Sequence, residues 1–265
     1  MLTEWFTHLT TACPPLVRKL GYLRESIAIR SRYRRCKTAW QPHLESSRAA
    51  LLESLHACSD FRTALVFGSG LLLDIPLSEL ASRFENVWLV DLIHLPEARR
   101  AARRYANVRC LSCDITGFLE QMETLSPNNL NLPPPASFLD DPAVDWVASV
   151  NLLSQLPLLP LDWLRKRFPG IDEMMLEEWS TQLMRQHLDY LAAFAVPTCL
   201  LADMEQTTYE QNGEVIEHAD FAAKLDFEHQ ALAQWRWDIA PPGEIASGIG
   251  RFHRVAAVTM KCGRN

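Results

Sequence analysis

Short apolar runs in this chain end in residues that can bind a ligand. The residues that follow these runs are Gly68-Ser69-Gly70, Asp91, Asp114, Asn151 and Asp203. Glycine lets a backbone approach a ligand without a Cβ in the way, and carboxylates accept hydrogen bonds from hydroxyl and amino groups. This pattern predicts one binding site assembled from the ends of several elements.

The order and spacing of these residues favour a ligand that contains a nucleoside. Asp91 lies 21 positions after Gly70. An acidic residue about 20 positions beyond such a glycine turn can take both hydroxyls of a ribose. Asp114, after the third run, can accept a hydrogen bond from an adenine amino group. A glycine pair or an acidic helix cap alone would be a weak signal, so the interpretation depends on the order.

The elements that must position these residues are those of an α/β sheet. Strands are predicted at 64–67, 87–90, 108–112, 144–150, 198–202, 235–239 and 253–260, and helical spacing at 77–84, 96–105 and 161–194. Strands that alternate with helices indicate a parallel sheet covered on both faces. The last two strands are joined by a short loop, which suits an antiparallel pair. We therefore predict a doubly wound, seven-stranded, mostly parallel sheet with an N-terminal helical extension.

Residues 1–58 have helical spacing with a pause at Gln41-Pro42. We expect an N-terminal helical cap over 1–58 and a main domain over 59–265, with a helical insertion at about 161–195. A basic cluster lies in the cap. Its members are Arg30, Arg32, Arg34, Arg35 and Lys37. Such a cluster is either a solvated or ion-paired helix face, or a site for a phosphate or carboxylate.

The layout resembles the class I S-adenosylmethionine-dependent methyltransferase superfamily, whose seven-stranded doubly wound domain ends in a reversed strand. The resemblance rests on VFGSG (66–70), VWLVD (87–91), CLSCDIT (110–116), VDWVASVN (144–151), CLLAD (199–203) and HRVAAVTM (253–260). It implies S-adenosyl-L-methionine as the cofactor. Gly68, Ser69 and Gly70 would line the methionine part, Asp91 with Leu92 the ribose, and Asp114 with Ile115 the adenine. Asn151 would face the sulfonium and the acceptor.

The chain departs from the family pattern at two positions of the glycine turn. Val66 stands where the family usually has an acidic residue, and Leu72 where it often has a third glycine. Asp74 either replaces the missing carboxylate near the cofactor's ammonium group or caps the helix predicted at 77–84, with Pro76 near the first helical position.

The resemblance implies methyl transfer to a small-molecule acceptor. Asn151 is followed by Leu-Leu-Ser and not by the Pro-Pro-aromatic run of methyltransferases acting on bases or glutamine. The candidate catalytic residues are Asn151, Asp203 and His187. The turn before Glu244 can bring that carboxylate over the cleft. Alternatives are a non-catalytic cofactor-binding scaffold or regulator, a nicotinamide or other nucleotide binder, and a nucleic-acid or protein methyltransferase.

Charge and composition limit the kinds of molecule that the protein is expected to bind. The net charge is -6, although residues 1–60 carry nine Lys or Arg and five Asp or Glu. No global field favours nucleic acid or an acidic membrane, so we expect a small-molecule substrate, and an anionic one if Arg30–Arg35 face inward. No apolar run reaches membrane-spanning length and no signal peptide is present, which predicts a cytoplasmic protein. Cys110 and Cys113 have metal or redox spacing, or are simply small buried residues.

Overall fold

The computed structural model describes residues 5, 7, 8, 10–225, 227 and 231–260. Its strands are β1 (Thr63–Phe67), β2 (Asn86–Asp91), β3 (Val108–Ser112), β4 (Val144–Val150), β5 (Thr198–Glu210), β6 (Val215–Asp220), β7 (Ala231–Ala240) and β8 (Ile249–Met260). They form one sheet in the order β3-β2-β1-β4-β5-β8-β7, with β6 paired to β5. The strands β1 to β5 run parallel, and β8 is antiparallel to both β5 and β7. The predicted fold class is confirmed, including the late antiparallel pair.

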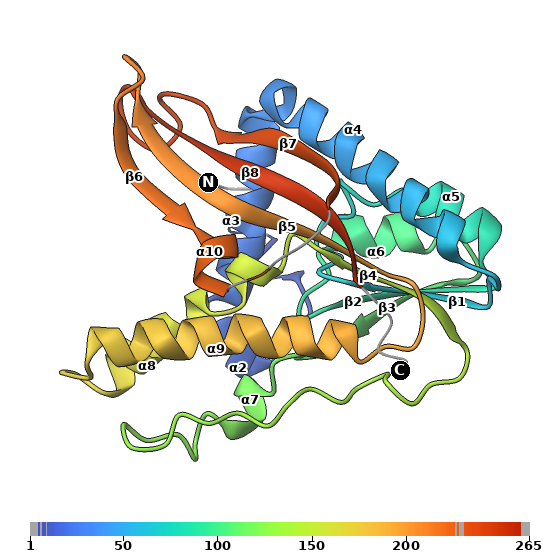
Figure 1. Ribbon diagram of the computed structural model, residues 1–265, viewed down its shortest axis with the longest axis horizontal. Helices are drawn as coiled ribbons and strands as arrows, with labels where there is room; N and C mark the ends of the chain where they lie inside the picture. Colours follow the sequence, from blue (N-terminus) through green and yellow to red (C-terminus); the bar gives the residue numbers. More distant parts are fainter. Residues whose placement is uncertain (1–4, 6, 9, 226, 228–230, 261–265) are drawn as a thin grey trace.

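Helices cover both faces of the sheet (Figure 1). They are α2 (Pro15–Lys19), α3 (Tyr22–Arg35), α4 (Lys37–Ser54), α5 (Leu77–Arg83), α6 (Pro96–Ala102), α7 (Phe118–Gln121), α8 (Leu158–Arg167), α9 (Glu173–Ala192) and α10 (Phe221–Leu225), with short 3₁₀ turns η1 (Leu55–Ala57) and η2 (Leu153–Gln155).

Alternate side chains of β1 point to opposite faces of the sheet and pack against different helices. Ala64 and Val66 pack into the same buried cluster as residues of α4, α5 and α6. Leu65 and Phe67 point to the other face, where Phe67 lies 5.6 Å from the ring of Tyr190 in α9. Because successive strand side chains alternate between faces, a fully buried strand such as β1 is apolar throughout.

Several predicted bounds are wrong. β7 and β8 each begin four residues before the predicted start, and β6 and α10 lie where no element was predicted. Two further errors concern α4 and β5. The helix does not pause at Pro42, which lies inside α4. The missing N–H leaves one carbonyl without its helical partner. That carbonyl belongs to Thr38, which is exposed, so solvent can replace the bond. The second error concerns the fifth strand, which continues to Glu210 because it pairs with β6 and β8 beyond the core. Asp203 therefore lies within β5 and not at its end.

The helices α3 and α4 are attached at opposite ends of the sheet's carboxyl edge. Leu23 and Ile27 of α3 pack against Ile93 and Leu95, which follow β2. At the other end, Trp40 of α4 packs edge-on against Trp237 of β7, with ring centroids 4.9 Å apart. The segment from α3 to α4 therefore crosses the edge where β1, β2 and β4 end.

The turn after β1 is tight for a packing reason. Gly68 has φ +70°, and a Cβ there would lie 2.5 Å from the carbonyl oxygen of Val150 in β4. Leu72, in the same turn, has φ +62° although it carries a side chain. A left-handed backbone costs a non-glycine residue about 1–2 kcal/mol. Leu72 is 9% exposed, and burying such a side chain contributes about 1.5–3 kcal/mol, which offsets that cost.

We predict an inverted order of stability for two substitutions of Leu72. Glycine is normally worse than alanine within regular structure by about 0.5–1 kcal/mol. At φ +62° the order should reverse, so that Leu72→Gly is more stable than Leu72→Ala by about 1 kcal/mol, both being less stable than the unchanged protein. Urea unfolding measures the difference. Leu80, fully buried in the helix α5, is the control, and its alanine variant should be the more stable one. The same order at both positions would refute the account.

Candidate functional site

A cavity of about 600 Å³ lies at the carboxyl edge of the sheet, beneath α3 and α4. All nine residues predicted to bind the cofactor line it. They are Gly68, Ser69, Gly70, Asp74, Asp91, Leu92, Asp114, Ile115 and Asn151. They come from the segments that follow β1, β2, β3 and β4, which is where ligands bind in an open α/β sheet. The volume lies within the usual range for sites that hold a small molecule or cofactor.

Asp91 links the end of β2 to the glycine turn. Its Oδ2 accepts a hydrogen bond from the Gly70 N–H at 2.8 Å, and its Oδ1 accepts one from the Ile93 N–H at 3.3 Å. Burial raises the pKa of this carboxyl, and the backbone N–H groups oppose the shift. Each carboxylate oxygen has a second lone pair, so Asp91 retains acceptor capacity towards the cavity.

The other residues of the glycine turn have different roles. The Ser69 side chain is turned to His94, with Oγ 3.0 Å from Nε2, while its N–H donates to the Val90 carbonyl and its own carbonyl accepts from the Leu72 N–H. Gly70 has φ +43°, and a Cβ added there would meet only atoms at 3.8 and 4.0 Å. Glycine at position 70 thus suits the left-handed backbone conformation, whereas glycine at position 68 is needed because β4 leaves no room for a Cβ.

Asp114 organises the loop after β3. Its Oδ1 accepts hydrogen bonds from the N–H and the hydroxyl of Thr116 at 2.9 and 2.6 Å. Its Oδ2 accepts one from the Leu119 N–H at 2.8 Å. Oδ2 therefore keeps more free acceptor capacity than Oδ1. Ile115, buried beside it, supplies an apolar wall.

Asp74 binds Asn151 and does not cap a helix. The Asn151 Nδ2 donates to Asp74 Oδ2 at 2.6 Å, whereas α5 begins after Pro76 without a side-chain cap. Burial raises the pKa of Asp74, and the hydrogen bond from Asn151 lowers it in part. Asn151 has φ +49°, a conformation that asparagine tolerates better than most residues. Its Oδ1 is buried and has no hydrogen-bond partner among the described residues.

His43, from α4, is a cavity residue that the sequence did not identify. The indole N–H of Trp235 donates to its Nδ1 at 3.0 Å, and its ring stacks on Trp237 at 3.9 Å. An indole nitrogen only donates, so the neutral His43 ring carries its hydrogen on Nε2. That N–H lies 3.3 Å from Asn151 Nδ2, and because both groups are donors in this tautomer, they do not bond to each other. Burial lowers the pKa of His43 to about 3, which keeps the ring neutral. Helical spacing alone did not show that this histidine faces a ligand cavity.

Two predicted catalytic residues lie outside the cavity lining. His187, in α9, is 2% exposed, its Nε2 lies 2.8 Å from Ser149 Oγ, and burial lowers its pKa to about 4. Asp203 is equally buried and accepts a hydrogen bond from Ser154 Oγ at 2.9 Å. Its Oδ2 also lies 2.9 Å from His253 Nδ1. Both residues belong to buried polar contacts of the sheet, and neither borders the ligand space.

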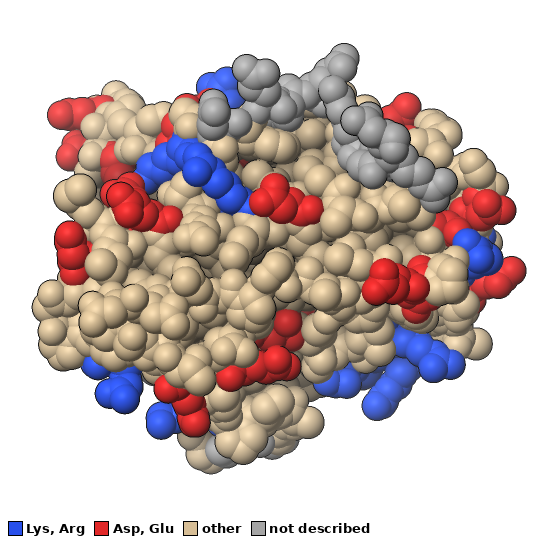
Figure 2. All heavy atoms as spheres, turned by 60° about the horizontal axis from the view of Figure 1, so that its bottom comes forward, with Lys and Arg blue, Asp and Glu red and all other residues tan. Residues whose placement is uncertain are grey.

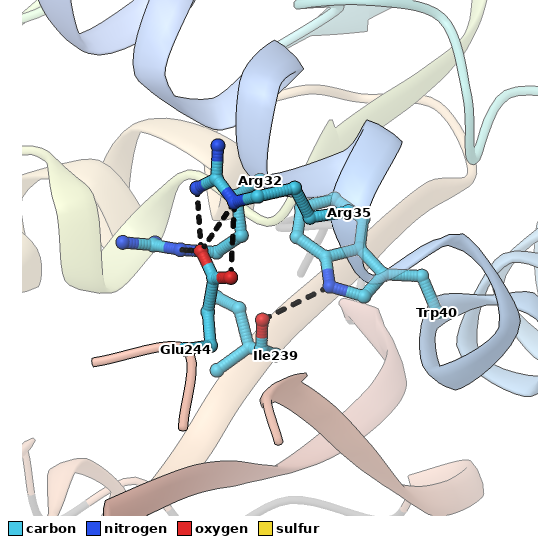
Figure 3. Close-up of polar contacts among 5 residues, drawn as sticks. All are labelled: Arg32, Arg35, Trp40, Ile239 and Glu244. Carbon is cyan, nitrogen blue, oxygen red and sulfur yellow. Dashed lines mark hydrogen bonds and ion pairs between the residues drawn. The ribbon is translucent and has the colours of Figure 1, made fainter. Parts of the chain in front are cut away.

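The basic cluster lies in α3, apart from Lys37 at the start of α4, and its members have different surroundings. Arg30 is buried and pairs with Glu97 at 3.2 Å. Arg35 makes a two-pronged contact with Glu244, through Nε at 3.0 Å and a terminal nitrogen at 2.5 Å (Figure 3). Arg32 lines the cavity. The remaining two members, Arg34 and Lys37, are exposed. The turn before Glu244 thus reaches α3.

Of the cysteine pair, Cys113 lines the cavity and Cys110 does not. Cys110 and Cys113 are free thiols, and burial raises the pKa of both. Within the described ranges no group of three metal-ligating side chains occurs, and no helix there is long and apolar enough to cross a membrane. On the face shown in Figure 2, acidic and basic side chains are interspersed, and neither kind forms a continuous patch.

No protein-family model and no curated protein matches the chain. Solved structures with a similar arrangement include the N-methyltransferase NodS from Bradyrhizobium japonicum WM9 with S-adenosyl-L-homocysteine, at 13% identity and a TM-score of 0.37 over 80% of this chain and 85% of that one. A second is 1,6-didemethyltoxoflavin-N1-methyltransferase from Burkholderia thailandensis, at 13% identity and a TM-score of 0.44 over 94% of this chain and 91% of that one. A third is a DhpI–SAH complex, at 15% identity and a TM-score of 0.39 over 94% of this chain and 98% of that one.

These likenesses are too distant to transfer the role of any residue. The chain's own sheet says more about the fold. The strand pairing gives its strand order directly, and it shows that β8, the last strand but one in the sheet, runs antiparallel to both neighbours. By that strand order and the reversed β8, the chain has the fold of the class I methyltransferases that its sequence resembles.

Proposed function

We propose that the chain binds S-adenosyl-L-methionine in this cavity and transfers its methyl group to a small molecule. The observation that carries the proposal is the convergence of nine separately predicted residues, from the ends of four strands, on one cavity of about 600 Å³. When bound, the cofactor supplies a methyl group on a positively charged sulfur. The protein then has to hold both reactants in line and exclude water.

The donors and acceptors in the cavity fit this cofactor. Asp91 offers acceptor lone pairs for the two ribose hydroxyls, and Asp114 with Ile115 offers an acceptor and an apolar wall for adenine. The buried, unpartnered Oδ1 of Asn151 and the carboxylate of Asp74 offer acceptors for the ammonium group of the methionine part. Asp74 thereby takes the role of the carboxylate that is missing at Val66.

The proposed cap over residues 1–58 covers the cavity. Tyr22 and Ile29 of α3 and Trp40 of α4 line it from above. The proposed insertion at about 161–195 contributes differently, because α8 borders the cavity with Asp162 and Lys166 while α9 packs into the core. A covered, largely apolar pocket is suited to a small acceptor. Of the predicted catalytic residues we keep only Asn151, as a positioning residue.

The first test of the proposal is to measure the binding of S-adenosyl-L-homocysteine (SAH) by calorimetry. The unchanged protein should bind it in the micromolar range. Asp91→Asn leaves only one acceptor oxygen for two ribose hydroxyls, so affinity should fall about tenfold or more, since a hydrogen bond to a charged group contributes about 1.5–3 kcal/mol. Asp189, exposed on α9, is the matched control, and Asp189→Asn should bind normally. No binding to the unchanged protein would reject the proposal.

Asp74 can be tested with two ligands that differ at the amino acid end. 5′-Methylthioadenosine keeps the nucleoside and sulfur but lacks the ammonium group. Asp74→Asn removes the charge without changing the side-chain volume, so it should weaken SAH about tenfold and leave 5′-methylthioadenosine within about twofold. Asp91→Asn, in contrast, should weaken both ligands. Equal losses for the two ligands in Asp74→Asn would contradict the assignment of Asp74 to the ammonium group.

A further inference from the structure

The end of the cavity beside β7 has the properties of an acceptor site. The sheet order places β2 and β3 on one side of β1, and β4, β5, β8 and β7 on the other. Asp91 and Asp114 follow β2 and β3, so the proposed nucleoside site occupies the first side. Trp237 and Ile239 of β7 line the second side, which is therefore left for the methyl acceptor.

The helix α3 follows the cavity from one end to the other. Near its start, Leu23 and Ile27 pack on the loop after β2. Near its end, Ile29 and Tyr33 pack on the cluster that contains Trp40 and Trp237. Arg24 and Glu25, which also line the cavity, precede Arg32 by seven or eight residues, which is about 12 Å along a helix. Arg32 is therefore the charged lining residue of α3 that lies at the β7 end.

Arg32 carries a positive charge that its neighbours do not neutralise. Its Nε forms an ion pair with Glu244 Oε1 at 3.7 Å, which is beyond hydrogen-bond distance, and this nitrogen has no hydrogen-bond partner among the described residues. The same carboxylate is already held by the two-pronged contact with Arg35 (Figure 3). Glu244 balances only one of the two guanidinium groups, so these three side chains together carry a net charge of +1.

A second donor at this end also lacks a partner. The Nε1 of Trp237 is buried without a hydrogen-bond partner among the described residues, and Trp237 itself is 5% exposed. An indole N–H left unpaired in a protein interior costs about 1–3 kcal/mol, so a ligand oxygen that accepts from it would gain affinity. The neighbouring Trp40 differs, because its indole N–H donates to the Ile239 carbonyl at 3.0 Å. Arg32 Nε and Trp237 Nε1 are thus two buried donors at this end without a partner among the described residues.

The walls around these donors are flat and apolar. Trp40, Trp237, Leu44, Ile29 and Ile239 line this part of the cavity. From these contacts, and resting on the proposed methyl transfer, we propose that the acceptor carries a carboxylate on a flat, apolar body. Arg32 and the Trp237 indole N–H bind the carboxylate, and the tryptophan and aliphatic side chains enclose the body.

The experiment uses the full chain saturated with SAH. Benzoate, 1-naphthoate and quinoline-2-carboxylate are titrated by calorimetry against their neutral amides. At least one carboxylate should bind, and its amide should bind about tenfold more weakly or worse. Arg32→Gln should weaken the carboxylate about tenfold or more while the affinity for SAH stays within about twofold. Arg35 still holds Glu244 in that variant, so the link between α3 and the loop after β7 is retained.

Two further variants distinguish the loss of a hydrogen-bond donor from a general disturbance of the structure. Trp237→Phe keeps an aromatic ring but removes the N–H, and it should weaken the carboxylate about threefold to tenfold. Arg34→Gln, on the exposed side of α3, should leave both ligands unchanged. Binding of SAH by each variant shows that it is folded.

Several results would overturn the inference. It fails if no carboxylate binds, if the amides bind equally well, or if Arg32→Gln retains carboxylate affinity. It also fails if Arg32→Gln loses affinity for SAH instead, because Arg32 would then hold the cofactor. If the unchanged protein does not bind SAH, the proposed function fails. The carboxylates are then titrated into the unliganded protein, where binding that depends on Arg32 still supports the inferred site and its absence rejects it.

Discussion

The close approach of the first turn to β4 is the constraint on which the site depends. Gly68 leaves no room for a side chain against the Val150 carbonyl, so the chain after β1 must turn directly beside the end of β4. This contact fixes Asn151, the next residue, next to the glycine turn. Asp91 then joins the same turn from β2 through the Gly70 N–H. Three strand ends are thus held together at the cavity by one close backbone contact and one hydrogen bond from a backbone N–H to a carboxylate.

Desolvation explains why polar groups in this cavity come in pairs. A buried carboxylate is costly unless it is hydrogen-bonded. Asp91 is satisfied by backbone N–H groups and Asp74 by Asn151, while burial still raises the pKa of both. His43 avoids the cost differently, since burial keeps it neutral and Trp235 satisfies its Nδ1. Asn151 Oδ1 is an exception, because it is buried without a hydrogen-bond partner among the described residues.

The sequence predicted the sheet well because buried strands and glycine turns are local signals. The bounds of β3 and β4 agree with the apolar runs, and the residues after them reach the predicted edge. Asp203 shows the limit of that reasoning. An aspartate after an apolar run looks like a strand end, but pairing with β6 and β8 extends β5 past it. His43 was not identified, and Arg32 was named only as one member of the basic cluster, because helical periodicity does not tell which part of the fold a helix faces.

The attachment of the helices over the cavity is mainly apolar, and this bears on how specific the site can be. Arg35 is more than half exposed, and exposed ion pairs contribute about 0–1 kcal/mol, so its contact with Glu244 alone would hold α3 weakly. Leu23 and Trp40 are almost fully buried at opposite ends, and each such side chain contributes about 1.5–3 kcal/mol. The side chains that line the cavity from above are therefore fixed by packing before any ligand arrives. A site fixed in this way loses little entropy on binding, and it can discriminate between acceptors by the placement of two donors and a few aromatic walls.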